Sequence, residues 1–168
     1  MRRGSNLVRE SNLSPDIRFM EAALAEARIA AGGGEVPVGA VICDPDGGVI
    51  ASAHNSMESL GDPTAHAEIL AIRSAAAKTG DWRLGGCVLY VTLEPCMMCM
   101  GAVANSRIET VVFGAYDETA GALDSNRAPV SHTVGYRGGV LERECGDLIR
   151  DFFRDVRQRR QKCHLTLS

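Results

Sequence analysis

Apolar positions along this chain follow two alternating patterns, one with helical spacing and one with strand spacing. Apolar residues three and four apart, bounded by Ser14 and Gly32, predict a first helix. Short apolar runs between turn residues predict strands over 36–43, 49–53, 87–92 and 108–113. Further helices are predicted over 66–77, after Pro95 and over 141–162, the last one amphipathic.

This alternation of helices and strands predicts one α/β domain. Helices that connect strands cover the faces of a sheet, so we expect a three-layer α/β/α arrangement with two helix N-termini on the same side. The 168 residues fit a single domain over 1–168 whose core needs no disulfide bonds. Residues 1–13 show no period and are expected to form a flexible tail.

Composition argues against several classes of protein. The six cysteines are too sparse for a disulfide scaffold, no early apolar stretch resembles a secretory signal, and no run is long enough to span a membrane. We therefore expect a cytoplasmic protein with reduced thiols and no membrane partner. The formal net charge of -3 argues against binding nucleic acid through bulk charge and leaves room for a local basic patch.

Two short motifs carry the candidate chemistry of the chain. The first is H-x-E, with His66 two residues before Glu68, and the second is P-C-x-x-C, with Cys96 and Cys99 three apart. Cysteines at this spacing share a helix face, and a helix N-terminus favours the thiolate form that binds zinc. We therefore expect His66, Cys96 and Cys99 to hold one Zn²⁺ ion.

Three protein ligands are typical of a catalytic zinc site. A structural site closes with four protein ligands, whereas a catalytic site leaves the fourth position to water. Glu68 is close enough to this position in sequence to act as a proton shuttle without being a ligand. The combination of H-x-E with P-C-x-x-C is the signature of zinc nucleobase deaminases.

Each motif also has a simpler interpretation. A C-x-x-C pair after a strand also occurs in redox proteins, and an isolated His66 would most often be a core or capping histidine. The joint spacing of the two motifs argues against both interpretations. The remaining cysteines are scattered singly and offer no second pair for a four-cysteine structural site: Cys43, Cys87, Cys145 and Cys163.

Several segments outside the metal motifs are also distinctive. They are EVPVGAV at 35–41, DPTAHAE at 62–68, LYVTLEPC at 89–96, SRI at 106–108 and VVFGA at 111–115. Together they closely resemble the bacterial tRNA-specific adenosine deaminases, which belong to the cytidine-deaminase-like superfamily. The resemblance covers most of 16–115, resumes over 139–154, and implies a cytidine-deaminase-like domain with a central mixed sheet.

The resemblance implies conversion of adenosine to inosine at the wobble position of a tRNA anticodon. It implies zinc on His66, Cys96 and Cys99, with Glu68 passing a proton from water to the base and to the leaving amine. It also implies two partners, the tRNA anticodon loop and a second copy of the chain, with one zinc ion in each subunit of the homodimer.

The resemblance also assigns contacts with the substrate, position by position. The backbone of Ala67 corresponds to a hydrogen-bonding contact with the base, and Asn55 to the asparagine that contacts the flipped nucleotide. Val38 lies where the family packs the purine. Asp117 aligns with an aspartate that contacts the neighbouring nucleotide. From spacing alone, Asn55 and Asp117 would be ordinary loop or turn residues.

The last helix is expected to contact RNA through Phe152, Phe153 and Arg157. These residues match the C-terminal helix that wraps the anticodon loop in the family, and aromatic rings followed by basic residues suit base stacking and phosphate contacts. The alternative is a solvated helix whose phenylalanines belong to the core. Its arginines would then simply favour the negative end of the helix dipole.

The chain departs from the family over 116–138. This segment is shorter than usual, and Tyr116 replaces a basic residue often found before Asp117. Because the region shapes the RNA-facing rim in the family, an alternative function is deamination of a free nucleobase or nucleoside of guanine, adenosine or cytosine type. A third alternative is a noncatalytic zinc-bearing subunit that only presents RNA, and the presence of Glu68 argues against it.

Overall fold

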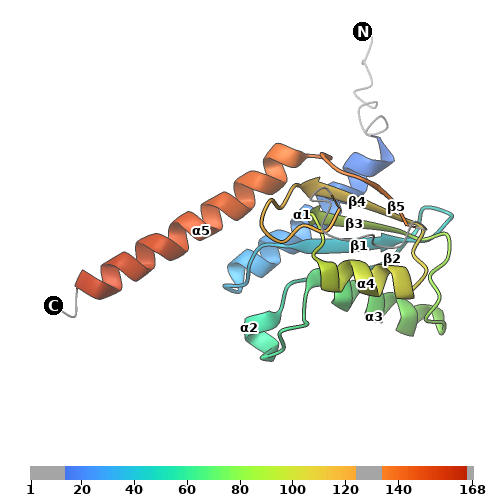
Figure 1. Cartoon of the computed structure of the whole chain (residues 1–168), viewed down its shortest axis with the longest axis horizontal. Coiled ribbons are helices and arrows are strands. Elements are labelled where there is room, and N and C mark those ends of the chain that lie inside the picture. The colour runs from blue at the N-terminus through green and yellow to red at the C-terminus, as the bar shows by residue number, and fades with distance from the viewer. Residues whose placement is uncertain (1–13, 124–133, 166–168) are drawn as a thin grey trace, which may run out of the picture.

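A five-stranded sheet lies at the centre of the computed structural model, which describes residues 14–123 and 134–165 (Figure 1). The strands are β1 (Gly39–Cys43), β2 (Val49–His54), β3 (Val88–Leu93), β4 (Thr110–Ala115) and β5 (Gly135–Arg137). Their order is β2-β1-β3-β4-β5. The sheet is mixed, because β1 is antiparallel to both of its neighbours whereas β3, β4 and β5 are parallel.

Helices cover both faces of this sheet. They are α1 (Pro15–Gly32), α2 (Met57–Leu60), α3 (Ala67–Thr79), α4 (Met97–Asn105) and α5 (Glu142–Leu165). Figure 1 shows α3 and α4 on one face and α1 on the other, which also receives the first turns of α5. The predicted three-layer α/β/α fold with a mixed sheet is therefore confirmed.

Alternating strand residues supply two apolar cores, one on each face of the sheet. On the α1 side, Val41, Tyr90 and Val112 pack against Phe19 and Met20. On the side of α3 and α4 the core is built from small and aliphatic side chains of the two helices and from the opposite set of strand positions: Ala40, Ile42, Ala67, Ala71, Leu89, Val91, Met100 and Val103. This alternation is what a sheet buried on both faces requires.

Strand direction brings the starts of α3 and α4 to the same edge of the sheet. Both β2 and β3 run antiparallel to β1, so these two strands point the same way. The helix α3 follows β2 through α2, and α4 follows β3 directly. The two helix N-termini therefore lie side by side, as expected from the sequence (Figure 1).

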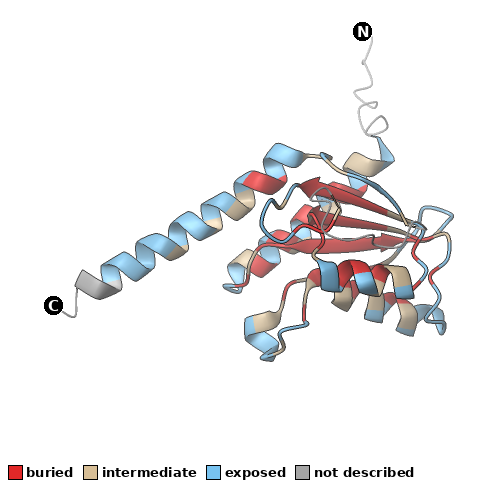
Figure 2. Cartoon of the chain, viewed as in Figure 1, coloured by how far each residue is buried: buried red, intermediate tan, exposed pale blue. Residues whose placement is uncertain are grey.

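The final helix is attached to the body by its first turns only. A Cβ atom on Gly114 would overlap Cys145, so the absence of a side chain in β4 lets α5 pack closely against the sheet. Cys145 is buried, and Leu148 and Phe152 are partly buried. From Arg157 to Lys162 every residue is exposed, and Figure 2 shows this part of α5 projecting away from the body.

The short strand β5 is tied to the start of α1. Asp16 accepts hydrogen bonds from Nε and Nη2 of Arg137, at 2.8 and 2.7 Å, and from the hydroxyl of Tyr90 at 2.9 Å. The hydrogen bond from Arg137 is the main reason that the pKa of Asp16 is lowered. This contact fixes an exposed edge strand that, among the described strands, pairs with β4 alone.

Several expected boundaries differ from the structure. The predicted strand over 36–43 begins only at Gly39, and the predicted helix over 141–162 spans Glu142–Leu165. The segment between the predicted strand over 49–53 and His66 contains α2, and the shortened segment over 116–138 contains β5, neither of which was predicted. The proposed flexible tail lies outside the described residues, and a single domain stays a prediction. None of the described helices is long and apolar enough to cross a membrane.

Candidate active site and metal centre

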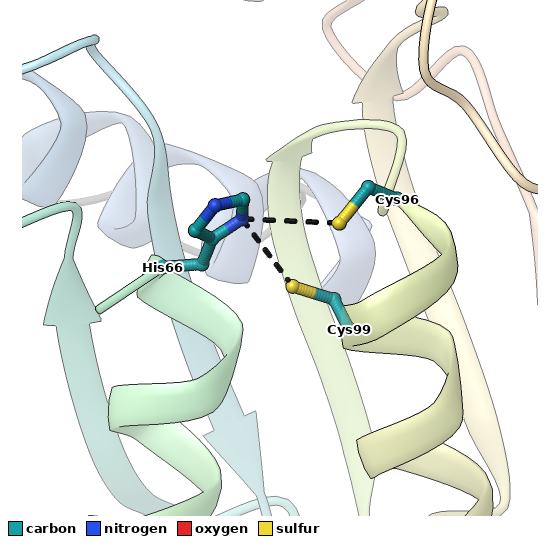
Figure 3. A group of neighbouring side chains, drawn as sticks. All are labelled: His66, Cys96 and Cys99. Carbon is teal, nitrogen blue, oxygen red and sulfur yellow. Dashed lines mark hydrogen bonds between the residues drawn. The ribbon is translucent and has the colours of Figure 1, made fainter. Parts of the chain in front are cut away.

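His66, Cys96 and Cys99 meet at the starts of α3 and α4. His66 is the N-cap residue of α3, Cys96 is the N-cap residue of α4, and Cys99 lies in the first turn of α4. Nδ1 of His66 is 3.5 Å from Sγ of Cys99 and 3.9 Å from Sγ of Cys96 (Figure 3). Tetrahedral zinc, with bonds of about 2.0 Å to nitrogen and 2.3 Å to sulfur, places these atoms about 3.5 Å apart. The three residues therefore fit a zinc ion.

The charge state of the two sulfurs also suits a metal. Hydrogen bonds from Cys99 and His66 lower the pKa of Cys96 to about 4, so its sulfur is a thiolate. The hydrogen bond to Cys96, together with burial, raises the pKa of Cys99. Zinc binding therefore releases the Cys99 proton, and the positive ends of two helices favour the resulting charge.

Glu68 lies beside the metal ligands and is buried, with 3 % of its surface exposed. Burial raises the pKa of this carboxyl group above its ordinary value, a direction that suits a group that exchanges protons with a substrate. Its Oε2 atom has no hydrogen-bond partner among the described residues. A buried polar atom without a partner is costly, and a water molecule or a substrate at the metal would supply one.

A cavity of about 150 Å³ opens next to Glu68. It is lined by Val36, Val38, Asn55, Met57, His66, Glu68, Leu93, Glu94, Cys96, Asp117 and Ala120. The volume is well below the roughly 300–1,000 Å³ of sites for drug-sized ligands, so the cavity suits one flat ring and leaves any attached sugar outside.

The structure brings some of the expected substrate residues into this cavity. Val38, Asn55 and Asp117 all line it. Asn55 is buried, and its Oδ1 accepts the backbone N–H of Ala67 at 2.9 Å. That hydrogen bond fixes the start of α3. It also uses the N–H of Ala67, one of the backbone groups of this residue that could contact a base. The contacts of the expected residues with a substrate stay predictions.

Asp117 is also engaged within its own loop. Its Oδ1 accepts the backbone N–H groups of Thr119 and Ala120 at 2.9 and 3.0 Å. This is the local turn geometry typical of aspartate, and it coexists with a place on the cavity wall.

The structure does not bring the expected residues of α5 into the cavity. Phe152 lines a separate hollow against the end of α1, whereas Phe153 and Arg157 line another hollow on α5 itself. Phe152 is partly buried, and Phe153 is 40 % exposed. Phe153 is therefore not a core residue, contrary to the alternative interpretation of this helix. A contact between α5 and the substrate requires a substrate that extends beyond the cavity.

Sequence reasoning missed two glutamates that build the cavity walls. Glu35 and Glu94 are both buried, and each accepts two backbone N–H groups from a segment distant in sequence. A charged residue directly before Pro95, at the end of an apolar strand, is the signal that could have revealed Glu94. Glu35 gives a similar signal before a buried strand.

Comparison with known proteins decides the family. The model of the cytidine and deoxycytidylate deaminase zinc-binding region matches residues 13–115. The chain belongs to this deaminase family. Zinc is therefore its cofactor, and the group of His66, Cys96 and Cys99 is the one that could hold it among the described residues.

Individual relatives show which kind of deaminase the chain resembles. It is 43% identical over 161 residues to the tRNA-specific adenosine deaminase of Bacillus subtilis, which covers 93% of this chain and 99% of the relative. A solved structure from work on A-to-I editing by tRNA:A34 deaminases has a TM-score of 0.74 and 43% identity, covering 78% of this chain and 98% of the other. The resemblance to bacterial tRNA-specific adenosine deaminases is confirmed.

The same fold also occurs in deaminases of free bases. A guanine deaminase structure from Nitrosomonas europaea is 25% identical, with a TM-score of 0.73 and coverage of 88% of both chains. The fold alone therefore does not separate a tRNA substrate from a free nucleobase.

Proposed function

We propose that the protein hydrolyses adenosine to inosine at the wobble position of a tRNA anticodon. The observation that carries this proposal is the buried Glu68 beside a metal triad at a cavity sized for one base. The high identity to tRNA-specific deaminases over nearly the full length of both chains supports the tRNA substrate.

In this mechanism, the protein residues hold the base and move protons. Bound to His66, Cys96 and Cys99, zinc supplies a Lewis acid that lowers the pKa of water. Val38 packs against the purine. Glu68 takes a proton from the attacking water and delivers it to N1 of adenine while the water oxygen bonds to C6. It then takes the remaining proton of that oxygen and passes it to the amine, which leaves C6 as ammonia while the C6=O bond of inosine forms. Water and adenosine enter, and inosine and ammonia leave.

Deamination of a free base is the second candidate function. It is favoured by the small volume of the cavity and by the likeness to a guanine deaminase. The catalytic roles of Glu68 and the metal ligands would be the same. The two candidates differ in whether groups outside the cavity, above all those on α5, contribute to binding.

The substrate is tested by mass spectrometry of the products. We expect the zinc-loaded protein to convert adenosine to inosine in a structured anticodon hairpin, because the base must be presented outside its stack. Free adenosine, guanine and cytidine are incubated separately. Product from a free compound alone would contradict the tRNA assignment and favour the second candidate.

We infer that the basic part of α5 contacts RNA phosphates. Arg157 and Arg160 are exposed, and the ion pairs of the described residues include neither. Replacing both with glutamine should weaken hairpin binding and lower the slope of log affinity against log salt by about one to two, since each phosphate contact contributes about 0.7–0.9.

The matched control for these arginines is the pair Arg150→Gln and Arg154→Gln. These side chains form ion pairs with Asp147 and Asp151 one turn earlier, so they have less charge available for RNA. An equal loss of slope in both double variants would mean that α5 acts through its overall charge. An unchanged slope in the Arg157 and Arg160 variant would remove these residues from the RNA contact.

We further propose that the protein forms a homodimer in the cytoplasm. Met97 and Met98 on α4 are 47% and 39% exposed, and exposed apolar side chains of this size suit a protein interface. The cysteines whose side chains are described form no disulfide bond, which suits a reducing compartment.

A further inference from the structure

Glu35 and Glu94 each use both carboxylate oxygens to hold a segment that lines the cavity. Their exposed fractions are 3% and 4%, and neither belongs to the metal group. A buried carboxylate is stable only when its oxygens accept hydrogen bonds, so such residues fix whatever donates to them.

Glu35 holds the α2 segment. Its Oε1 accepts the N–H of Ser59 at 2.8 Å, and its Oε2 accepts the N–H of Glu58 at 3.1 Å. The side chain of Ser56 gives no cap to α2, and a helix of four residues cannot stand alone. The distant carboxylate therefore acts as the cap of α2, whose first residue, Met57, lines the cavity.

The pKa of Glu35 agrees with this contact. Burial opposes ionisation, but the hydrogen bonds from the backbone of Ser59 and Glu58 outweigh it and lower the pKa of the carboxyl group. Glu35 is thus an anion that accepts from both N–H groups at neutral pH.

Glu94 holds a second loop, residues 117–123. Its Oε2 accepts the N–H of Asp117 at 3.1 Å, and its Oε1 accepts the N–H of Leu123 at 2.8 Å. The next residue, Pro95, accepts the N–H of Ala122 at 3.0 Å. A Cβ atom on Gly121 would overlap the carboxylate, so the loop closes tightly around it. Asp117 and Ala120, both on the cavity wall, belong to this loop.

We propose that Glu35 and Glu94 are positioning residues that fix two walls of the base cavity. The consequence for catalysis rests on the proposed deaminase function, whereas the two contacts themselves do not. When the walls of the cavity are already ordered, binding of a base costs less conformational free energy. A small displacement of the base from the reacting groups lowers the reaction rate strongly.

Hydrogen exchange of individual amides tests the contacts directly. A glutamine has one oxygen acceptor, and its NH₂ group faces an N–H donor, so Glu94→Gln loses at least one hydrogen bond. We expect exchange at Asp117 and Leu123 to rise about 10- to 100-fold, the effect of losing a hydrogen bond to a charged group. Exchange at Glu58 and Ser59 should stay unchanged.

Glu35→Gln gives the reciprocal pattern and is the matched control. Exchange should rise at Glu58 and Ser59 and stay unchanged at Asp117 and Leu123. A rise across all four amides in either variant would indicate general destabilisation and overturn the proposal, as would no rise at the amides in contact with the changed residue. These results do not depend on which substrate the enzyme uses.

Kinetics on the anticodon hairpin tests the positioning role. We expect either glutamine variant to lower kcat/KM by up to about 100-fold, mostly through a higher KM, with zinc content unchanged. A merely structural role would reduce the active fraction and leave KM unchanged. Equal kcat/KM in the variants and the original protein would overturn the positioning role. An original protein inactive on every hairpin would instead contradict the tRNA function.

A second variant disturbs the same loop with both glutamates in place. Gly121→Ala introduces a Cβ atom that overlaps the Glu94 carboxylate and the backbone carbonyl oxygen of Asp117 in the same loop. We expect it to reproduce the higher exchange at Asp117 and the higher KM of Glu94→Gln. Normal exchange and KM in this variant would show that the loop does not depend on close contact with Glu94.

Discussion

Glu68→Gln is expected to keep its zinc and lose turnover by about 10²- to 10⁴-fold, the usual contribution of a positioned acid or base. Glutamine has nearly the same shape, so the buried site can stay folded. It cannot take a proton from water or deliver one to the base. Because Glu68 is no part of the metal group, the loss should appear in kcat rather than in metal content.

Single-turnover rates on the hairpin and metal analysis of the same sample measure this prediction. The control is Glu21→Gln, which removes an exposed carboxylate of α1 and should leave both quantities unchanged. Turnover within a few-fold of the original protein would remove Glu68 from the mechanism.

Cys99→Ala is expected to lose zinc altogether. Cys99 is fully buried and supplies one of the two sulfurs of the metal group, so its loss leaves two protein ligands, too few for a stable tetrahedral site. Removal of a metal that binds only the folded protein also removes the stability that comes with it. The variant should therefore show no change in melting temperature on addition of a chelator.

The control for Cys99→Ala is Cys87→Ala. Cys87 is a buried free thiol outside the metal group, so its loss creates a comparable small cavity without touching the ligands. Zinc content by atomic spectroscopy should stay at one ion per chain in the control and fall to none in Cys99→Ala. Retention of zinc in both would overturn the ligand assignment.

Local sequence was enough to predict a group of side chains that could hold the metal. His66, Cys96 and Cys99 lie within two short motifs at helix starts, where spacing alone places side chains on one face. The order of helices and strands then brings the two helix starts to one edge of the sheet. The positions of these three side chains therefore follow from two motifs that are local in sequence and from a common order of helices and strands.

The walls of the cavity could not be predicted in this way. The helix α2 is too short to form by its own propensity, and it depends on Glu35, more than twenty residues earlier. The loop after Asp117 depends on Glu94 in the same manner. The strand β5 has three exposed residues and shows no alternation, so it becomes a strand only by pairing with β4.

The exposed end of α5 could be predicted as a helix but not placed in space. Its arginines and the exposed Phe153 gave an amphipathic pattern that fits either a core face or a binding face. The sequence did not show that the packed part would end near Val156.

Attachment of α5 by its first turns alone leaves its far half free to change. Each residue added to or removed from a helix shifts its tip by about 1.5 Å, and beyond Val156 such a change touches neither apolar core. Mutations there therefore carry little cost in folding and none in metal binding. The reach of the protein toward a large substrate can evolve independently of the chemistry at Glu68.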